Sequence, residues 1–240
     1  MTDRHVIIIG ASSGIGRKLA ELYSGKGART GITGRRAELL NEIKNKNPYL
    51  IEIEQFDVTE NNNFSHLESL ITKLGGLDTL IISAGTGEPS EDLDWEIDRQ
   101  TVATNVNGFT SIANWAFRYF RKQGYGRLAL ISSVAANRGG LHAPAYNASK
   151  AFQSSYAYGL ALKAAKISRE FSVTCIEPGF VDTPMAKSDQ LFWVVPVDKA
   201  GRQIMRGIES RKRKVYVSRR WRLVAWVLRH IPHWLYRKIG

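Results

Sequence analysis

A glycine-rich turn near the start of the chain constrains the fold more than any other feature. Residues 10–16 read Gly-Ala-Ser-Ser-Gly-Ile-Gly; they follow the apolar run 5–9 and lead into a stretch with helical spacing, 15–26. Glycines let the backbone approach a pyrophosphate, and free amides at a helix N-terminus attract its charge. The pattern predicts a dinucleotide site, although an ordinary tight connection would use similar glycines. The expected contacts are Gly10, Ser12, Ser13, Gly14, Ile15 and Gly16.

Short apolar runs alternate with helical stretches along most of the chain. This alternation predicts an α/β protein: a single-domain Rossmann fold with a doubly wound, seven-stranded parallel sheet and helices on both faces. The expected strands are 5–9, 29–33, 50–55, 79–83, 127–132, 172–177 and 214–217, and the expected helices are 15–26, 36–46, 63–74, 94–122, 144–166 and 198–210.

Basic residues gather at the end of the chain. The formal net charge is +12, and residues 211–240 hold ten Lys or Arg and no Asp or Glu. We therefore separate a Rossmann domain, 1–218, from a basic amphipathic helical tail, 219–240, interrupted at Pro232. The tail fits peripheral association with an anionic membrane; packing on its own domain or on another subunit is the alternative. Nucleic acid is not expected, because no reading element accompanies the charge.

Cysteine content and hydropathy indicate the compartment. Cys175 is the only cysteine, so no intrachain disulfide is possible. No apolar run approaches the roughly 20 residues of a spanning helix, and the first apolar run is too short for a secretory signal. We expect a cytoplasmic protein, with contact at the inner face of a membrane left open by the tail. No metal site is expected.

The residues after the second expected strand bear on cofactor choice. A chain that binds NAD(H) usually has an acidic residue there for the ribose hydroxyls, but this chain has Gly34-Arg35-Arg36. Guanidinium groups would pair with a 2′-phosphate, so NADP(H) is preferred over NAD(H), unless both arginines are merely solvated.

Two further loops follow strand ends, where ligands bind in doubly wound sheets. Asp57-Val58 follows the third expected strand, and Ala84-Gly85 follows the fourth. Asp57 could accept the adenine amino group, and Gly85 would let the adenine or ribose approach the backbone. Plain turn residues are the alternative for both loops.

Four polar residues form a second candidate site. Tyr146 precedes Lys150 by four residues in a helical stretch, so the two share a helix face. A phenol titrates near pKa ~10, and a nearby ammonium favours phenolate, which would let Tyr146 exchange a proton with a substrate oxygen. Ser133, with Ser132 as a rival, follows the fifth strand and could orient that oxygen; a helix-cap or turn serine is the alternative. Asn105 is unfavourable in a helix, which suggests a special bond, such as one to a water beside Lys150, although a surface asparagine is the alternative.

These residues, in this order, resemble the short-chain dehydrogenase/reductase superfamily, as does the run 178–183, Pro-Gly-Phe-Val-Asp-Thr. The resemblance implies that Tyr146 is the proton donor in reduction and that Lys150 binds the nicotinamide ribose and lowers the tyrosine pKa. It implies that Ser133 positions the carbonyl and that Asn105 supports a water relay. The implied cofactor contacts also include Asn105, Tyr146, Lys150, Pro178, Gly179, Val181 and Thr183, of which Val181 and Thr183 would hold the carboxamide.

Two residues depart from the family pattern. Ile9 replaces a threonine before the first glycine, and Ser83 replaces an asparagine before Ala84-Gly85, so local hydrogen bonds there are expected to differ.

The segment 184–196 forms the substrate lid in the family that the chain resembles. It contains Leu191-Phe192-Trp193-Val194-Val195, which suggests an apolar substrate of the ketone or 3-oxoacyl type, unless these residues only pack the lid on the body. We expect an oxidoreductase that moves a hydride between NADP(H) and a carbonyl or alcohol substrate, in a homodimer or homotetramer. A catalytically silent cofactor-binding scaffold or regulatory protein of the same fold is the alternative.

Overall fold

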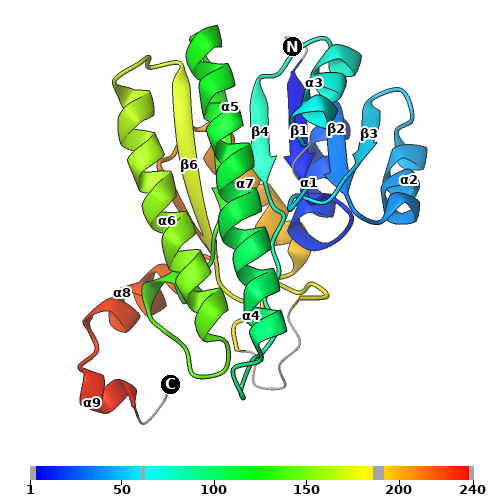
Figure 1. Cartoon of the computed structure of the whole chain (residues 1–240). Helices are drawn as coiled ribbons and strands as arrows, with labels where there is room; N and C mark the ends of the chain where they lie inside the picture. The colour runs from blue at the N-terminus through cyan, green and yellow to red at the C-terminus, as the bar shows by residue number, and fades with distance from the viewer. Residues whose placement is uncertain (1–3, 61–62, 186–191, 238–240) are drawn as a thin grey trace.

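A seven-stranded parallel sheet forms the centre of the computed structural model, which describes residues 4–60, 63–185 and 192–237 (Figure 1). The strand order is β3-β2-β1-β4-β5-β6-β7, and every neighbouring pair is parallel. The order reverses between β1 and β4, so the doubly wound fold is confirmed. The strands are β1 (His5–Ile9), β2 (Arg29–Gly34), β3 (Ile51–Gln55), β4 (Thr79–Ile82), β5 (Gly126–Ile131), β6 (Phe171–Pro178) and β7 (Lys214–Val217).

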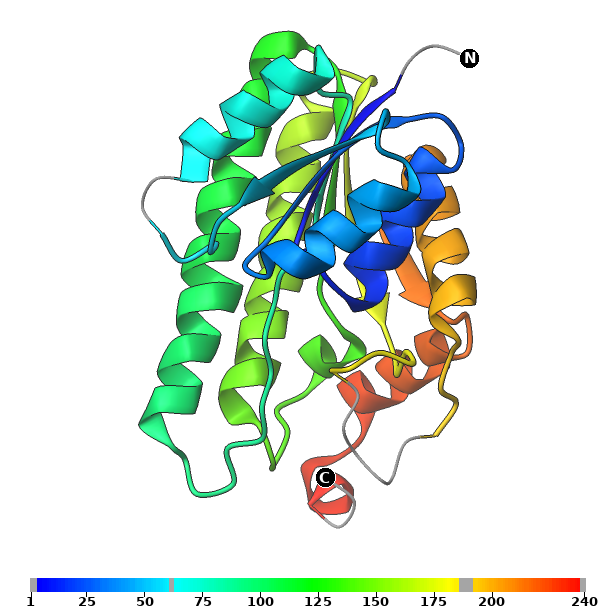
Figure 2. The same cartoon turned by 90° about the vertical axis from the view of Figure 1, so that its right-hand side faces the viewer.

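Helices cover both faces of the sheet, as the side view shows (Figure 2). Successive residues of β1 point to opposite faces, so Val6 and Ile8 join one core cluster and Ile7 and Ile9 join the other. A strand that is buried on both faces needs a continuous apolar run, which is the pattern of this segment. The first cluster packs against α1 (Gly14–Ser24), α2 (Ala37–Lys46) and α7 (Val197–Glu209), and the second packs against α3 (Asn63–Leu74), α5 (Phe109–Gln123) and α6 (Pro144–Ala165).

The prediction of a single helix over 94–122 is wrong in the middle of the segment. The segment consists of α4 (Trp95–Val102), a π-helical stretch η1 (Ala103–Gly108) and α5. A Cβ on Gly108 would lie 2.5 Å from the carbonyl oxygen of Val58, so the helix can approach the loop after β3 only with glycine there. Because the π turn changes the helical phase, Asn105 becomes fully buried at the site described below.

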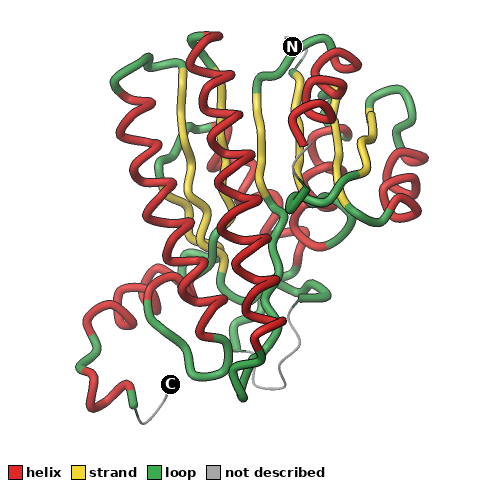
Figure 3. Tube along the Cα trace, viewed as in Figure 1, coloured by secondary structure: helices red, strands yellow, loops and turns green. Residues whose placement is uncertain are grey.

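The tail consists of α8 (Trp221–His230) and α9 (His233–Tyr236), which are separated at Pro232 as expected (Figure 3). Trp221 and Ala225 are buried, and α8 packs beside the short 3-10 helix η2 (Val134–Asn137). One side of the tail therefore belongs to the domain. Among the described residues, no helix has the length and hydropathy to cross a bilayer.

Six of the thirteen residues of the segment expected as a lid, 186–191 including Leu191, lie outside the described residues. Its end returns to the sheet edge, where Val195 forms a parallel bridge with Val181. The main-chain nitrogen of Val195 donates to the carbonyl of Phe180, at 2.9 Å, and its carbonyl accepts from Asp182, at 3.0 Å.

Candidate functional site

The glycine turn lies at the point where the strand order reverses. Gly10 has φ 80°, and a Cβ on it would lie 2.5 Å from the nitrogen and Cα of Ala84, so the loops after β1 and β4 touch there. A Cβ on Gly16 would lie 2.1 Å from the carbonyl oxygen of Gly10, which explains why α1 can pack directly on the turn. This edge of an open parallel sheet is where such folds bind nucleotides.

The N-terminus of α1 opens onto the same crevice. Ser13 precedes the helix with extended backbone, and its side chain does not cap the helix amides. A Cβ on Gly14 would lie 3.3 Å from Thr183 Cγ2, so the expected contacts at the end of β6 lie next to the glycine turn. The first amides of α1 are thus available to an anion between these two segments.

The two arginines after β2 have different surroundings. Arg36 donates to the hydroxyls of Ser12 and Ser13, at 2.8 and 3.0 Å, which places its guanidinium beside the glycine turn. Arg35 is largely exposed and pairs with Asp57 Oδ2 at 3.3 Å. The other oxygen of Asp57 accepts from the main chain and hydroxyl of Thr59, so Asp57 also has the turn role that the sequence left open.

Tyr146 and Ser133 meet at the same edge of the sheet. The Ser133 hydroxyl forms a hydrogen bond with the Tyr146 phenol, and it also accepts from Ala135 N at 3.1 Å. The rival Ser132 instead donates to the main-chain carbonyl of Lys150 at 2.8 Å and accepts from Ser154 at 2.9 Å. Ser132 therefore holds β5 to α6, while Ser133 contacts the tyrosine.

Burial determines the electrostatics of the pair Tyr146 and Lys150. Burial raises the pKa of Tyr146, and the hydrogen bond from Ser133 lowers that pKa in part. Burial also lowers the pKa of Lys150 to about 8, and its Nζ lies 5.6 Å from the centroid of the tyrosine ring. That Lys150 lowers the pKa of Tyr146 stays a prediction.

Asn105 connects three segments through its side chain. Its Oδ1 accepts from Thr86 N at 2.9 Å, and its Nδ2 donates to Thr86 O at 2.7 Å and to Ser149 Oγ at 3.0 Å. Ser149 in turn donates to the carbonyl of Tyr146 at 2.7 Å. Asn105 therefore fixes the loop after β4 against the first turn of α6, and it is not the surface residue that one interpretation of the sequence allowed.

The main-chain carbonyl of Asn105 faces a residue that the sequence analysis missed. Gln153 donates from Nε2 to this carbonyl at 2.9 Å, and its Oε1 accepts from Lys150 Nζ at 3.0 Å. Both Asn105 and Gln153 are fully buried. A side-chain amide thus stands between the lysine and the asparagine, where the resemblance implies a water. The signal was present in the sequence, because Gln153 is a polar residue three positions after Lys150 on the same helix face.

Two more residues shape the site and were also missed. A Cβ on Gly87 would lie 2.3 Å from Tyr146 Cδ2, so the ring rests directly on the backbone after β4. Asn147 donates from Nδ2 to the carbonyls of Ala135 and Arg138, at 3.1 and 2.9 Å, and so holds the loop that follows Ser133. Both roles depend on loops that meet only in the folded chain.

The expected nicotinamide end lies beneath the tail. Gly179 follows β6, its nitrogen donates to Val217 O at 2.7 Å, and a Cβ on it would lie 2.0 Å from the indole of Trp221. Phe180 packs edge-on against the same indole at 5.2 Å. The first turn of α8 therefore supports the segment that carries Val181 and Thr183.

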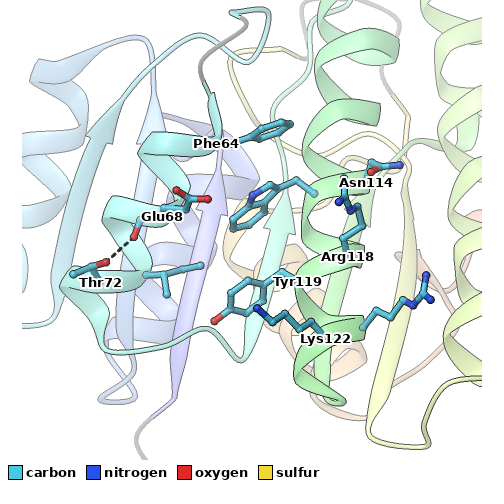
Figure 4. Close-up of a pocket in the computed structure, with 10 residues that line it drawn as sticks. Phe64, Glu68, Thr72, Asn114, Arg118, Tyr119 and Lys122 are labelled. Atoms are coloured by element: carbon cyan, nitrogen blue, oxygen red, sulfur yellow. Dashed lines mark hydrogen bonds between the residues drawn. The ribbon is translucent and has the colours of Figure 1, made fainter.

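A surface hollow of about 760 Å³ lies elsewhere, between α3 and α5 (Figure 4). Phe64 and Tyr119 flank Trp115 there, with ring centroids 6.3 and 5.6 Å from the indole. None of its lining residues belongs to the candidate site, so we do not assign the chemistry to it.

Comparisons with known proteins agree with this geometry. The family model described as short chain dehydrogenase matches residues 4–191. An uncharacterized oxidoreductase of Myxococcus xanthus is 31% identical over 195 residues, which cover 79% of this chain and 76% of the relative.

Two solved structures share the fold. The short-chain dehydrogenase of Sphingobium yanoikuyae in complex with NADPH has a TM-score of 0.80 at 22% identity, over 99% of this chain and 96% of that one. The 3-ketoacyl-(acyl-carrier-protein) reductase of Brucella melitensis complexed with NADH has a TM-score of 0.78 at 18% identity, over 89% and 96%. The family match, the sheet order and the relative together show that this chain is an oxidoreductase of the short-chain dehydrogenase/reductase family.

Proposed function

We propose that the protein is an NADPH-dependent reductase of apolar ketones. The observation that carries this proposal is the hydrogen-bonded pair of Tyr146 and Ser133 beside the buried Lys150, at the sheet edge that also holds the glycine turn. A phenol that can donate a proton, next to a second hydroxyl, suits the reduction of a carbonyl oxygen.

The residues at the glycine turn fit a dinucleotide with a 2′-phosphate. The uncapped amides of α1 suit the pyrophosphate, and Arg36 with the hydroxyls of Ser12 and Ser13 offers three donor side chains to a phosphate. Within the part of the chain that the structure describes, Arg36 forms no ion pair, and β2 ends in Gly34 where an acid would favour NAD(H). The Sphingobium protein with NADPH supports this preference, and the Brucella protein with NADH shows that the fold alone does not decide it.

When bound, the nicotinamide would supply the hydride to the carbonyl carbon. Ser133 would hold the carbonyl oxygen, and Tyr146 would donate the phenolic proton to that oxygen as it gains charge. Lys150 would hold the nicotinamide ribose and, when charged, favour the tyrosinate that remains. Val181 and Thr183 would orient the carboxamide, while Asn105 keeps the loop after β4 in place.

Aromatic side chains beside the site favour an apolar substrate. Phe192 packs against Phe180 and Trp221, with ring centroids 5.7 and 5.1 Å apart, and continues into Trp193 at 5.7 Å. The Brucella protein is by its description a reductase of 3-ketoacyl groups, which supports a ketone of the 3-oxoacyl type.

The oligomeric state and the cellular location of the protein are also proposals. A homodimer or homotetramer is supported by the outer side of α6, where Phe152, Tyr158 and Leu162 are exposed by 37, 52 and 48%. A cytoplasmic position, at the inner face of a membrane, is supported by the lone buried Cys175 and by the basic tail.

An NADPH-consumption screen over ketones, including long-chain ketones and 3-oxoacyl thioesters, tests the proposal. We expect turnover of apolar ketones by the wild type and its loss in Tyr146→Phe. Tight NADPH binding without turnover of any carbonyl would contradict the proposal and favour the scaffold interpretation.

A further inference from the structure

The tail carries two apolar faces, of which only one is used by the domain. Trp221 and Ala225 of α8 are 2 and 1% exposed, whereas Leu223, Trp226 and Val227 on another side of the helix are 61, 59 and 40% exposed. In α9, Trp234 and Leu235 are 66 and 37% exposed. Soluble domains rarely expose such a concentration of large apolar side chains without a partner. We name these five exposed residues, Leu223, Trp226, Val227, Trp234 and Leu235, the tail edge.

Exposed cations lie near the tail edge in the sequence. Arg219, Arg220, Arg222 and Arg237 are exposed, and no Asp or Glu occurs between residues 211 and 240. The guanidinium of Arg220 lies 6.0 Å from the ring of Trp193, which extends this surface to the residues before α7. The tail edge thus combines large apolar side chains with neighbouring cations, and its tryptophans suit a lipid interface.

Helices α8 and α9 lie below the carboxyl ends of the strands in both views (Figures 1 and 2). Arg229 donates from Nε to Asn137 Oδ1 at 2.6 Å, and the Tyr236 hydroxyl donates to Gly139 O at 2.6 Å. Both contacts are to the loop that begins at Ser133. The orientation of the tail relative to the site is therefore fixed by α8 and α9 together.

Acidic residues lie on the other side of that loop. Glu88, Glu91, Asp92 and Asp94 are exposed in the segment leading to α4, and Ser90 N within it donates to His142 O at 2.8 Å. In both views the loop before α6 lies between this acidic segment and the tail (Figures 1 and 2). The two sides of this loop therefore differ: the side toward α4 is acidic, and the side toward the tail is basic and apolar and suits an anionic surface.

A second copy of the chain fits this surface poorly. A symmetric contact between two tail edges would bring two sets of arginines together without an acid in either tail, and like charges oppose such an interface. An anionic bilayer satisfies both features, because its headgroups pair with the cations and its interface accepts tryptophan and leucine side chains.

We propose that the tail edge docks on an anionic lipid surface and that the ketone enters the site from that surface. The substrate class is then a long-chain ketone dissolved in the bilayer. This inference rests on the proposed function for its second half, while the docking itself does not depend on turnover.

The test uses the full-length protein, because deletion of residues 219–240 would remove Trp221 from its buried position against Gly179. Flotation with vesicles of phosphatidylcholine alone is compared with flotation on phosphatidylcholine mixed with phosphatidylglycerol. We expect binding only to the anionic vesicles, and weaker binding as salt rises. The double variant Arg219→Gln/Arg222→Gln should reduce partitioning about tenfold or more, since each cation near such a surface contributes roughly a fivefold factor. Trp226→Ser/Trp234→Ser should also reduce partitioning, because it removes two apolar anchors from the interface.

Control variants remove an equal charge, or an exposed aromatic side chain, elsewhere. Arg121→Gln/Lys122→Gln at the end of α5, and Tyr49→Ser, which is 95% exposed, should leave flotation unchanged. Melting temperatures confirm that every variant is folded. Absence of the wild type from anionic vesicles at low salt would overturn the docking, as would equal loss in the controls. Tail variants that dissociate an oligomer in gel filtration yet float like the wild type would show that a second copy covers the tail edge.

A kinetic comparison tests substrate entry. Anionic vesicles should raise kcat/KM for a long-chain ketone several-fold in the wild type and controls but not in the tail variants, while a short water-soluble ketone is unaffected. Equal kcat/KM for the long-chain ketone with and without vesicles, in an enzyme that reduces the short one, would overturn entry from the bilayer. No turnover of either ketone by vesicle-bound protein would contradict the proposed function and leave the docking supported.

Discussion

The side chain of Gln153 accepts a 3.0 Å hydrogen bond from the ammonium of Lys150 inside the protein. Lys150 also donates to Ile131 O at 3.4 Å, so Gln153 is the nearer of the two acceptors that the described residues offer it. Because Gln153 Nε2 is held by the carbonyl of Asn105, the orientation of the amide is determined and its oxygen must face the lysine. We expect Gln153 to act as a positioning residue that stabilises the charged form of Lys150.

Substitutions of Gln153 should therefore shift the pH dependence of the enzyme in opposite directions. Burial lowers the pKa of Lys150 to about 8, and the ammonium is present below that pH. Gln153→Leu removes the acceptor and lowers the pKa of Lys150 further, so the alkaline limb of the pH profile of kcat should move to lower pH. Gln153→Glu adds a carboxylate beside the ammonium, and the limb should move to higher pH. Shifts in the same direction for both variants would contradict the assignment, and the pH dependence of NADPH binding provides a check without turnover.

Tyr146→Phe should reduce kcat by about 10²- to 10⁴-fold, the usual contribution of a general acid, while NADPH affinity stays nearly unchanged. The reason is that only the hydroxyl is removed from a ring that packs on Gly87. Lys150→Met, which keeps much of the side-chain volume, should weaken both kcat and NADPH binding. Activity of Tyr146→Phe above a few per cent of wild type would exclude Tyr146 as the proton donor, and unchanged NADPH affinity in Lys150→Met would exclude Lys150 from the ribose.

The local pattern of apolar residues was sufficient to predict the sheet and the order of its strands along the chain. In β1 every residue from Val6 to Ile9 is apolar because both faces of the strand are covered, and the glycine turn follows at once. Helical spacing cannot distinguish an α-helix from one with a π turn, however, so the expected helix over 94–122 concealed η1. Asn105 lies in this π turn, and its hydrogen bonds to Thr86 and Ser149 cannot be inferred from the residues next to it in the sequence.

The candidate site was predictable as a set of residues, but not as a set of contacts. The spacing of Tyr146 and Lys150, the position of Ser133 after a strand and the family resemblance together predicted one site, and these side chains do lie together. Whether Ser132 or Ser133 faces the tyrosine depends on a single residue at the end of β5, which periodicity does not resolve. The contact of Trp221 with Gly179 joins residues more than 40 positions apart and follows only from the tertiary packing of α8.

Arg36 and Arg35 provide a matched pair for cofactor choice. Arg36 lies beside the hydroxyls of Ser12 and Ser13, whereas Arg35 pairs with Asp57 and is largely exposed. A charged hydrogen bond to a phosphate contributes about 1.5 to 3 kcal/mol, so Arg36→Ala should weaken NADPH binding by roughly ten- to a hundredfold. NADH affinity should change little, and Arg35→Ala should have a smaller effect on either cofactor. Fluorescence titration of both variants with both cofactors measures this difference, and equal losses for NADPH and NADH would rule out a phosphate contact.

Gly87→Ala should lower kcat without a matching loss of NADPH affinity. The added Cβ would lie 2.3 and 2.6 Å from Cδ2 and Cε2 of Tyr146, which is closer than carbon atoms can approach, so the ring must move. Movement of the ring changes the position of the phenol relative to Ser133, and a displacement of about 1 Å at a reacting group can cost about 10²-fold in rate.

Gly139→Ala is the control, because a Cβ on Gly139 meets no atom within 4 Å, and its kcat should equal that of the wild type. Steady-state kinetics and melting temperatures of the two alanine variants separate a local effect on the site from a general loss of stability. If Gly87→Ala retains full kcat, then the loop after β4 yields to the added methyl group. The position of the Tyr146 ring would in that case not depend on the backbone of Gly87, and Ser133 with the first turn of α6 would be sufficient to hold the phenol.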